Sequence, residues 1–359
     1  MAGPVAYRRR VFECSGCRAS TAPLDAEMGV ASGQKLSRGV ERKVAWSVAH
    51  HSFSAAAADM VEMTGIEVSP AECQRVALEV GRRLEEEQRR RDAERLAPVG
   101  PEAPAPEPEV AAERLVLMAD AACVLTVAGE EHKSVLCGRA FALEDRARKQ
   151  KDRGAGRPFI GLSRHAADAQ SWETFAPRLK ALAWRMGLRR ARRVAFVGDG
   201  AAPQWRWAEE NLPADAALIQ DFWHVVEHLA GVAREVFDEN EAAMAERLER
   251  WKTLLRASGL EEILEELRAE HRRRRGAKRQ RLEKEIAYLE RGRARMDYAR
   301  FEAEGWPIGS GAIEADCKHL VKERFDLTGA RWRRANIQPV LALRTAIFNQ
   351  EWETAWRRN

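Results

Sequence analysis

Three acidic residues stand at positions from which they could act together. Asp120 and Asp199 each follow a short apolar run, and Glu314 follows the turn Gly309-Ser310-Gly311. Carboxylates at the ends of strands can converge on one edge of a sheet, and Mg²⁺ requires such hard oxygen ligands. Two ions about 4 Å apart activate an attacking oxygen and stabilise the leaving one in phosphoryl transfer. A single Asp at a strand end is more often a turn residue or helix N-cap, so the order of all three acids is what favours a two-metal site.

The helix expected after Glu314 places cations near this carboxylate. If the helix begins near Ile313, then Glu314, Lys318 and Lys322 lie on one face at four-residue spacing. Two ammonium groups would flank a metal-bound carboxylate, where a phosphate backbone could lie. Ordinary Glu–Lys pairing on an exposed helix has the same spacing. The spacing leaves both interpretations open.

The tetrapeptide Asp221-Phe222-Trp223-His224 is expected where the last strand passes into a helix. Asp221 and His224 are candidate accessory residues that brace the catalytic edge or contact a nucleotide. Alternatively, His224 is a hydrogen-bonded structural residue, and His228 one turn later simply shares its helix face.

Cys14 and Cys17 form a CxxC pair between Arg8-Arg9-Arg10 and Arg18. Tetrahedral Zn²⁺ needs four ligands, so this pair is half of a zinc ribbon, and no second CxxC follows. Cys73 belongs to a predicted helix. A partial Zn²⁺ site at Cys14 and Cys17 is therefore the most that this segment predicts.

Basic residues concentrate in a helical segment before residue 300 and in the C-terminal tail. Arginine and lysine suit phosphate contact, and interleaved tryptophan suits base stacking. In the tail, Trp352 and Trp356 have helical spacing that favours packing, so the arginines are the better candidates for DNA contact. The alternative for the helical segment is a solvated hairpin whose charges only keep it soluble. The candidate DNA-binding residues are Arg272, Arg273, Arg274, Arg275, Lys318, Lys322, Arg324, Arg331, Arg333 and Arg334.

Composition narrows the class of protein. The chain has 359 residues and a formal net charge of +5, and 32% of its residues are charged. This length predicts two or three domains. No apolar run approaches the roughly 18 residues of a spanning helix, which excludes an integral membrane protein. The N-terminus lacks the apolar core of a secretory signal, and six scattered cysteines do not suggest a disulfide scaffold, so we expect a cytoplasmic protein.

A proline-rich stretch divides the chain. Residues 97–109 (APVGPEAPAPEPE) have no apolar periodicity and predict an extended spacer. Upstream, Ala55 to Met63 is a predicted helix closed by Gly65, and Ser69-Pro70-Ala71-Glu72 predicts the capped start of another. This outline is that of a helix-turn-helix, and an ordinary small helical bundle is equally compatible with it.

Downstream of the spacer, strands alternate with helices. A hairpin followed by βαβ units indicates a mixed α/β sheet, and residues 225 to 300 then lose all strand character. We interpret that segment as a helical insertion with a basic arm. The expected strands are Leu115–Met118, which ends at Asp120, Ala122–Val127, Ser134–Phe141, Val194–Val197 and Ala216–Ile219, and Trp172–Met186 is an expected helix.

Together these residues resemble the DDE transposases of bacterial insertion sequences, nearest the ISKra group. The resemblance covers most of residues 110–359, and the block that ends in Glu314 is highly specific. Cys14 to Asp25 more weakly resembles the end of that group's zinc ribbon. The matching segments are GDGA at 198–201 with Trp205 and Trp207, LIQDFWH at 218–224, WPIGSGAIEA at 306–315, LTGARW at 327–332 and LALR at 341–344, continuing to Trp356.

The resemblance implies a ribonuclease-H-like catalytic core with an all-α insertion at about 225–300. It implies that Asp120, Asp199 and Glu314 hold two Mg²⁺ or Mn²⁺ ions, and that Asp221 and His224 are the D-x-x-H signature. The family usually has Gly after the first Asp, whereas this chain has Ala121. The expected units are a partial zinc-ribbon-like segment (1–38), a helix-turn-helix-like DNA-binding region (39–96), a linker (97–110) and the catalytic domain (111–359).

The expected activity is metal-dependent cleavage at element ends and transfer of the freed 3′-hydroxyl into target DNA. The expected partners are the terminal repeats, target DNA and further copies of the chain, in the nucleoid of a prokaryotic cytoplasm. Two alternatives stay open: a decayed transposase that only binds DNA, and a structure-selective nuclease that resembles a junction resolvase.

Overall fold

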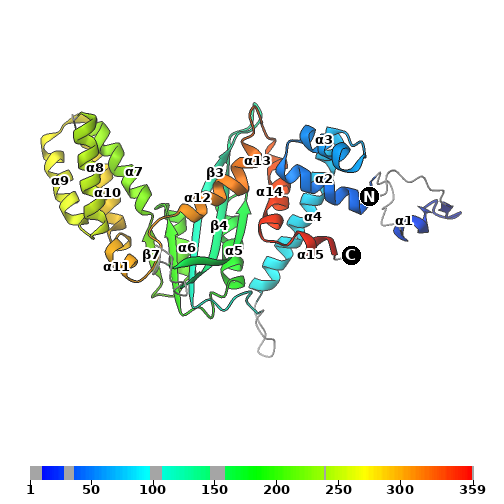
Figure 1. Ribbon diagram of the computed structural model, residues 1–359, viewed down its shortest axis with the longest axis horizontal. Helices are drawn as coiled ribbons and strands as arrows, with labels where there is room; N and C mark the ends of the chain where they lie inside the picture. Colours follow the sequence, from blue (N-terminus) through cyan, green and yellow to red (C-terminus); the bar gives the residue numbers. More distant parts are fainter. Residues whose placement is uncertain (1–9, 28–35, 98–106, 146–157, 238–239, 358–359) are drawn as a thin grey trace, which may run out of the picture.

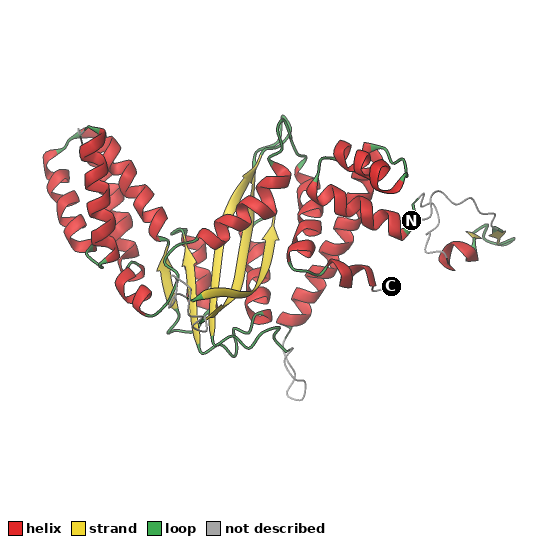
Figure 2. Ribbon diagram, in the orientation of Figure 1, coloured by secondary structure: helices red, strands yellow, loops and turns green. Residues whose placement is uncertain are grey.

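A five-stranded mixed sheet forms the centre of the molecule (Figures 1 and 2). The computed structural model describes residues 10–27, 36–97, 107–145, 158–237 and 240–357. The strand order is β5-β4-β3-β6-β7, with β3, β4 and β5 antiparallel and with β6 and β7 parallel to β3. This sheet confirms the α/β class. The strands are β3 (Arg114–Val124), β4 (Lys133–Glu144), β5 (Phe159–Asp168), β6 (Arg193–Gly198) and β7 (Ala217–Gln220).

Two details of the sheet differ from expectation. The runs expected to form two strands around Asp120 are a single strand, β3, because antiparallel pairing with β4 continues without a break from Leu115 to Val124. The prediction that a strand ends at Asp120 was therefore wrong. Strand β5 was not predicted, since most of its residues are only half-buried and give no clear alternation.

The two faces of the sheet bury different residues of the same strands, as the two-residue period requires. Leu115, Leu117 and Phe196 pack on one face beneath α5 (Trp172–Arg185) and α6 (Ala202–Asn211). Val116, Met118 and Val197 pack on the other face. That second face is covered by α12 (Gly311–Asp316) and the π-helical turn η2 (Cys317–Lys322), which leads into α13 (Glu323–Phe325).

A set of helices follows β7, in agreement with the helical character predicted for residues 225 to 300. Their buried residues, such as Trp251 and Ile263, continue the core of the second sheet face. Figure 1 shows these helices as an arm at one end of the sheet. They are α7 (Phe222–Val236), α8 (Glu241–Arg256), α9 (Leu260–Arg273), α10 (Gly276–Gly292), the 3-10 turn η1 (Arg293–Arg295) and α11 (Tyr298–Ala303).

The N-terminal helices lie at the other end of the sheet. The Ser69 hydroxyl accepts a hydrogen bond from the Glu72 amide, and Gly65 ends the preceding helix in the left-handed region with φ 65°. Both predicted signals are thus confirmed. The helices are α2 (Arg38–His50), α3 (Phe53–Thr64) and α4 (Pro70–Leu96); ahead of them lie β1 (Phe12–Glu13), β2 (Ser20–Thr21) and α1 (Pro23–Glu27), and the proline-rich spacer lies mostly outside the described residues.

Helix α4 packs along α14 (Arg334–Phe348), so the N-terminal helices share a core with the C-terminus. The approach is so close that a Cβ at Gly81 would lie 2.2 Å from the Pro339 carbonyl oxygen. The last helix, α15 (Trp352–Arg357), buries Trp352, as its spacing predicts. Among the described helices, none has the length and apolar character needed to cross a membrane.

A buried ionic cluster joins α4 to the sheet. Arg178 of α5 pairs with Glu85 of α4, and its Nε lies 3.0 Å from the carboxylate of Asp168 at the end of β5. Gln338 of α14 donates to the other oxygen of Glu85 at 2.8 Å. Because these charges are buried, each depends on its partners for compensation.

We expect Arg178→Met to lower the free energy of unfolding by about 3–5 kcal/mol, because it leaves the buried Asp168 without its cation and Glu85 with only the partly exposed Arg89. Denaturant unfolding would measure the loss. The matched control is Arg75→Met on the exposed side of α4, where the pairs with Glu72 and Glu79 contribute less than about 1 kcal/mol. Equal losses in the two variants would contradict the assignment of the buried cluster.

Candidate functional site

Asp120 and Asp199 occupy equivalent places on neighbouring parallel strands. The last paired residues of β3 and β6 are Met118 and Val197. Asp120 lies two residues after Met118, and Asp199 lies two residues after Val197. Asp120 therefore lies in the middle of β3 but at the point where its pairing with β6 ends. The two-residue period directs Asp120 to the same face as Met118.

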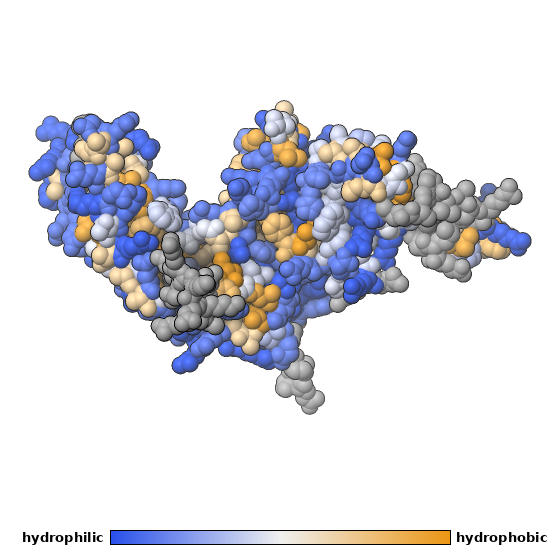
Figure 3. Space-filling model, in the orientation of Figure 1, coloured by the Kyte–Doolittle hydropathy of each residue, from blue (hydrophilic) through white to orange (hydrophobic). Residues whose placement is uncertain are grey.

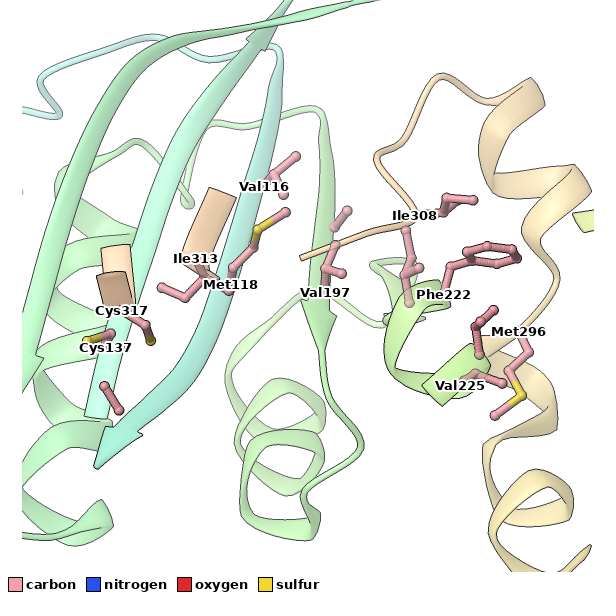
Figure 4. Packing of buried hydrophobic residues seen from close by; sticks show 14 of the residues in the cluster. Val116, Met118, Cys137, Val197, Phe222, Val225, Met296, Ile308, Ile313 and Cys317 are labelled. Atoms are coloured by element: carbon pink, nitrogen blue, oxygen red, sulfur yellow. The ribbon is translucent and has the colours of Figure 1, made fainter. Parts of the chain in front are cut away.

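Glu314 reaches this face from the far end of the chain. Ile313 and Cys317 pack close to Met118 and Cys137 of the sheet (Figure 4). The Cys317 Sγ lies 3.7 Å from Asp120 Oδ2, and the Ser310 hydroxyl donates to Glu314 Oε1 at 2.7 Å. Helix α12 thus brings the third acid to the two that the strands supply.

The three carboxylates influence one another. Burial raises the pKa of Asp120, and the negative charges of Asp199 and Glu314 add to this increase. Backbone amides compensate in part: Asp120 Oδ1 accepts from the Ala121 amide at 2.7 Å, and Asp199 Oδ1 accepts from the Ala201 amide at 2.9 Å. These like charges favour a cation between them.

The carboxylate oxygens of Asp120, Asp199 and Glu314 are suitable ligands for Mg²⁺, but they do not lie close enough together to form one coordination shell. Within the described residues, no group of three or more His, Cys, Asp and Glu side chains is arranged to hold a metal ion. Among the residues that the structure describes, no Lys, Arg or His forms an ion pair with Asp120, Asp199 or Glu314. They are therefore available oxygen donors, and their closure around an ion is an expectation.

Asp221 fastens the start of α7 to the loop before α12. Its Oδ1 accepts from the amides of Trp223 and His224 as a helix N-cap, and its Oδ2 accepts from the Ser310 amide at 2.7 Å. Asp221 is buried, whereas the His224 ring is about a third exposed (36%). The geometry of Asp221 matches the bracing alternative, and His224 faces solvent beside it.

The helical arm contributes residues that the sequence analysis did not select. The ring of Tyr288 from α10 stacks on His228 with centroids 4.1 Å apart, and it packs against Gly200 directly after Asp199. Burial raises the pKa of Tyr288, and the negative charges of Glu285 and Asp199 contribute. Tyr288 lies 89 residues beyond Asp199 in a charged helix, so no sequence signal connects the two.

Glu285 is a second such residue. Its carboxylate lies 3.2 Å from His228 Nδ1 and accepts from Arg281 at 2.6 Å. Burial alone would raise the pKa of Glu285, but these hydrogen bonds outweigh burial and lower it. His228, expected only to share a helix face, is therefore held in place by α10.

The lysines after Glu314 do not follow a continuous α-helix. The chain changes to i→i+5 bonding from Cys317 to Lys322, so the spacing argument for one α-helical face does not apply. Lys318 and Lys322 are both exposed. They remain candidates for phosphate contact because they are exposed, and their spacing gives no further support.

One predicted DNA-binding residue is misassigned. Arg324 is buried, donates to the Val48 carbonyl at 2.6 Å and lies over the rings of Phe53 and Trp332. Burial lowers its pKa to about 10. It attaches the C-terminal end of α2 to the segment that contains α13 and Trp332, and its burial leaves it inaccessible to DNA.

The other candidate arginines differ in accessibility. Trp332 forms a β-bridge with Thr126, and the arginines around it are exposed, namely Arg331, Arg333 and Arg334. Three of the four arginines around the end of α9 are exposed: Arg272, Arg273 and Arg275. Arg273 and the half-buried Arg274 both pair with Glu270. Many neighbouring arginines of the arm also pair with glutamates, as the solvated-hairpin alternative expects.

Cys14 and Cys17 lie on the turn between β1 and β2. The two strands pair antiparallel, and the Cys14 amide donates to the Ala19 carbonyl at 2.8 Å. Amides of Cys17 and Gly16 lower the pKa of the Cys14 thiol, which suits a thiolate ligand. Both cysteines are exposed, and the described residues around them supply no further ligand.

Comparison with protein-family models and with curated proteins yields no match to this chain. The assignment of a function therefore rests on the geometry described above.

The raised pKa of Asp120 predicts a pH-dependent gain in stability for Asp120→Asn in metal-free buffer. Below the ordinary aspartate pKa of about 3.9 the carboxyl is protonated in both folded and unfolded chains, so the variant gains nothing. As the pH rises above this value, the unfolded chain releases its proton before the folded chain does, so the wild type loses stability until the pH has passed the folded pKa, and the variant becomes the more stable protein. Thermal unfolding with chelator at about pH 3 and about pH 7.5 measures the difference. A variant less stable than wild type at pH 7.5 would contradict the like-charge cluster.

Proposed function

We propose that the protein is a DNA transposase that cuts at the ends of its element and transfers the freed 3′-hydroxyl to target DNA. The observation that carries the proposal is the convergence of Asp120, Asp199 and Glu314 on one sheet face, from three segments of the chain. Carboxylates that are unpaired, mutually repelling and supported on rigid elements are suited to bind divalent cations.

The topology supports a ribonuclease-H-like core. Three antiparallel strands are followed by two that run parallel to the first, and the first strand lies at the centre of the sheet. A helical arm between β7 and α12 accounts for the 115 positions that separate Asp199 from Glu314. Both features are those expected of the DDE transposases that the sequence resembles.

Asp120, Asp199 and Glu314 would hold the metal ions, and Asp221 would position the loop from which the Glu314 helix starts. Bound Mg²⁺ would activate the attacking oxygen and stabilise the leaving one. The chain itself supplies the placement of the carboxylates. Tyr288 packs against the loop that follows Asp199, and its stacking partner His228 is held by Glu285.

The shape of the molecule suits an extended polyanion. Helix α12 lies across the sheet between the helical arm and α13 (Figure 1), and the space-filling view is hollowed between the arm and the centre (Figure 3). The turn η2 and the loop after α13 carry exposed cations, namely Lys318, Lys322 and Arg331. We propose that they contact phosphates of the DNA.

If several phosphates are contacted, the logarithm of the binding constant falls linearly and steeply with the logarithm of salt concentration. We expect Arg331→Ala with Arg333→Ala to reduce this slope by about one to two units and to weaken binding to all sequences alike. Fluorescence anisotropy at several salt concentrations measures the slope. A wild-type affinity that does not respond to salt would exclude the phosphate clamp.

A DNA-binding protein without catalysis is the second candidate. It is favoured by the absence of a closed ligand group among the described residues and by Ala121 in place of the usual Gly. In this case Asp120, Asp199 and Glu314 would be relics of an enzyme.

The decisive experiment is cleavage of labelled DNA that carries the inverted repeats flanking the gene, with Mg²⁺ or Mn²⁺. We expect nicking at the element boundary by the wild type and a loss of at least about 100-fold for Asp199→Asn. The matched control is Asp215→Asn, an exposed aspartate in the loop before β7, which should cleave like wild type. Binding to the ends without cleavage, by a folded protein supplied with either metal, would favour the second candidate.

A further inference from the structure

A buried ionic cluster lies beneath the helix that carries Glu314. Asp316, two residues after Glu314, is almost inaccessible to solvent (3% exposed). Its Oδ1 lies 3.1 Å from Arg139 Nη1 on β4, and its Oδ2 lies 2.6 Å from His165 Nδ1 on β5. One acidic side chain of α12 is thus bound to two strands of the sheet.

Arg139 holds α12 on both sides of Glu314. The same Nη1 that faces Asp316 donates to the Ala312 carbonyl at 2.9 Å, two residues before Glu314. The Arg139 Nε donates to the Ser163 hydroxyl on β5 at 2.8 Å, which fixes the plane of the guanidinium. A planar guanidinium has several N–H donors and can make these contacts simultaneously, whereas the ammonium group of lysine cannot donate in the same directions.

The register of the sheet places this cluster close to the other acids. Arg139 is opposite Met118 on β3, and Cys137, two residues earlier, is opposite Asp120. Arg139 and Asp120 therefore belong to the same sheet face, and the guanidinium occupies a fixed position relative to Asp120. Contacts of Arg139 with α12 accordingly set the distance between Glu314 and Asp120.

The histidine of the cluster is fastened from the opposite side. Asn349, just after α14, accepts from the His165 amide at 2.8 Å and donates to the His165 carbonyl at 2.9 Å. The Phe348 ring contacts the His165 imidazole edge-on at 5.8 Å between centroids. The cluster is consequently rigid, since each member is bound by at least two elements.

We propose that Arg139 is a positioning residue that, with Asp316, holds Glu314 in the place where it can share a divalent cation with Asp120. This inference rests on the proposed metal-dependent function. It concerns the geometry of the carboxylates, and it does not require Arg139 to touch DNA or metal. Residues that orient metal ligands typically change metal affinity or activity by about 10–100-fold when they are replaced.

The test compares Arg139→Lys with Arg164→Lys in the full chain. Lysine keeps the positive charge next to Asp316, so the variant avoids an uncompensated buried carboxylate. Arg164 is the matched control because it lies on β5, pairs with Glu109, and is opposite Ala140, which packs on the other sheet face. Glu314→Gln serves as the reference for loss of the ligand.

Two quantities are measured for each protein: the Mg²⁺ concentration that gives half of the Mg²⁺-dependent rise in Tm, and the kcat and KM of DNA cleavage. Bound ligand raises Tm by mass action, so the first readout does not depend on activity. We expect Arg139→Lys to need about tenfold more Mg²⁺ and to lose at least about tenfold in kcat, with KM for DNA within about twofold of wild type. Asp316→Asn is a second variant with the same expected direction, and Arg164→Lys should match wild type.

The outcomes separate this inference from the proposed function. Equal Mg²⁺ requirements and kcat for Arg139→Lys and Arg164→Lys would overturn the positioning role, as would a wild type whose Tm does not respond to Mg²⁺. If Mg²⁺ stabilises wild type through Glu314 and Arg139, but no DNA is cleaved, then the positioning role stands and the transposase proposal fails.

Discussion

The packing of α12 and the π-helical turn η2 onto the sheet is the contact on which the candidate site depends. Ile313 and Cys317 bury their side chains against the face that carries Asp120, and this apolar contact brings Glu314 to the acids of β3 and β6. Without it, the third acid would be part of a solvent-exposed helix. The mutual repulsion of the carboxylates is tolerated because packing around them holds the elements together.

Several polar contacts reinforce this packing from different directions. Asp221 ties the loop before α12 to the start of α7, and Arg139 ties α12 to β4. Arg344, which is buried, donates to carbonyls of η2 and of the end of α2. Each of these contacts closes a large sequence separation. The site therefore depends on the whole described chain. The N-terminal helices are coupled to it by hydrogen bonds between residues that lie far apart in the sequence.

The helical arm supports the candidate site in addition to its predicted role as a carrier of basic residues. It was predicted as a carrier of basic residues, yet many of its arginines pair with glutamates of the same arm. Tyr288 on its inner side packs next to Gly200, and Glu285 of the same helix pairs with His228 of α7. Because the arm reaches back to the candidate site, the placement of Asp199 depends on the folding of α7 and α10.

Local patterns of apolar and turn residues were enough to predict the class of the fold, the caps at Ser69 and Gly65, and the order of the three acids along the chain. These patterns did not predict the unbroken strand through Asp120, which follows from pairing with β4, nor the burial of Arg324 against the Val48 carbonyl and the Trp332 ring. Arg139, Asp316, Tyr288 and Glu285 were also missed. Their roles depend on long-range contacts, because a polar residue looks the same in a sequence whether its side chain lies in solvent or in a buried pair, and the partners lie up to 177 positions away.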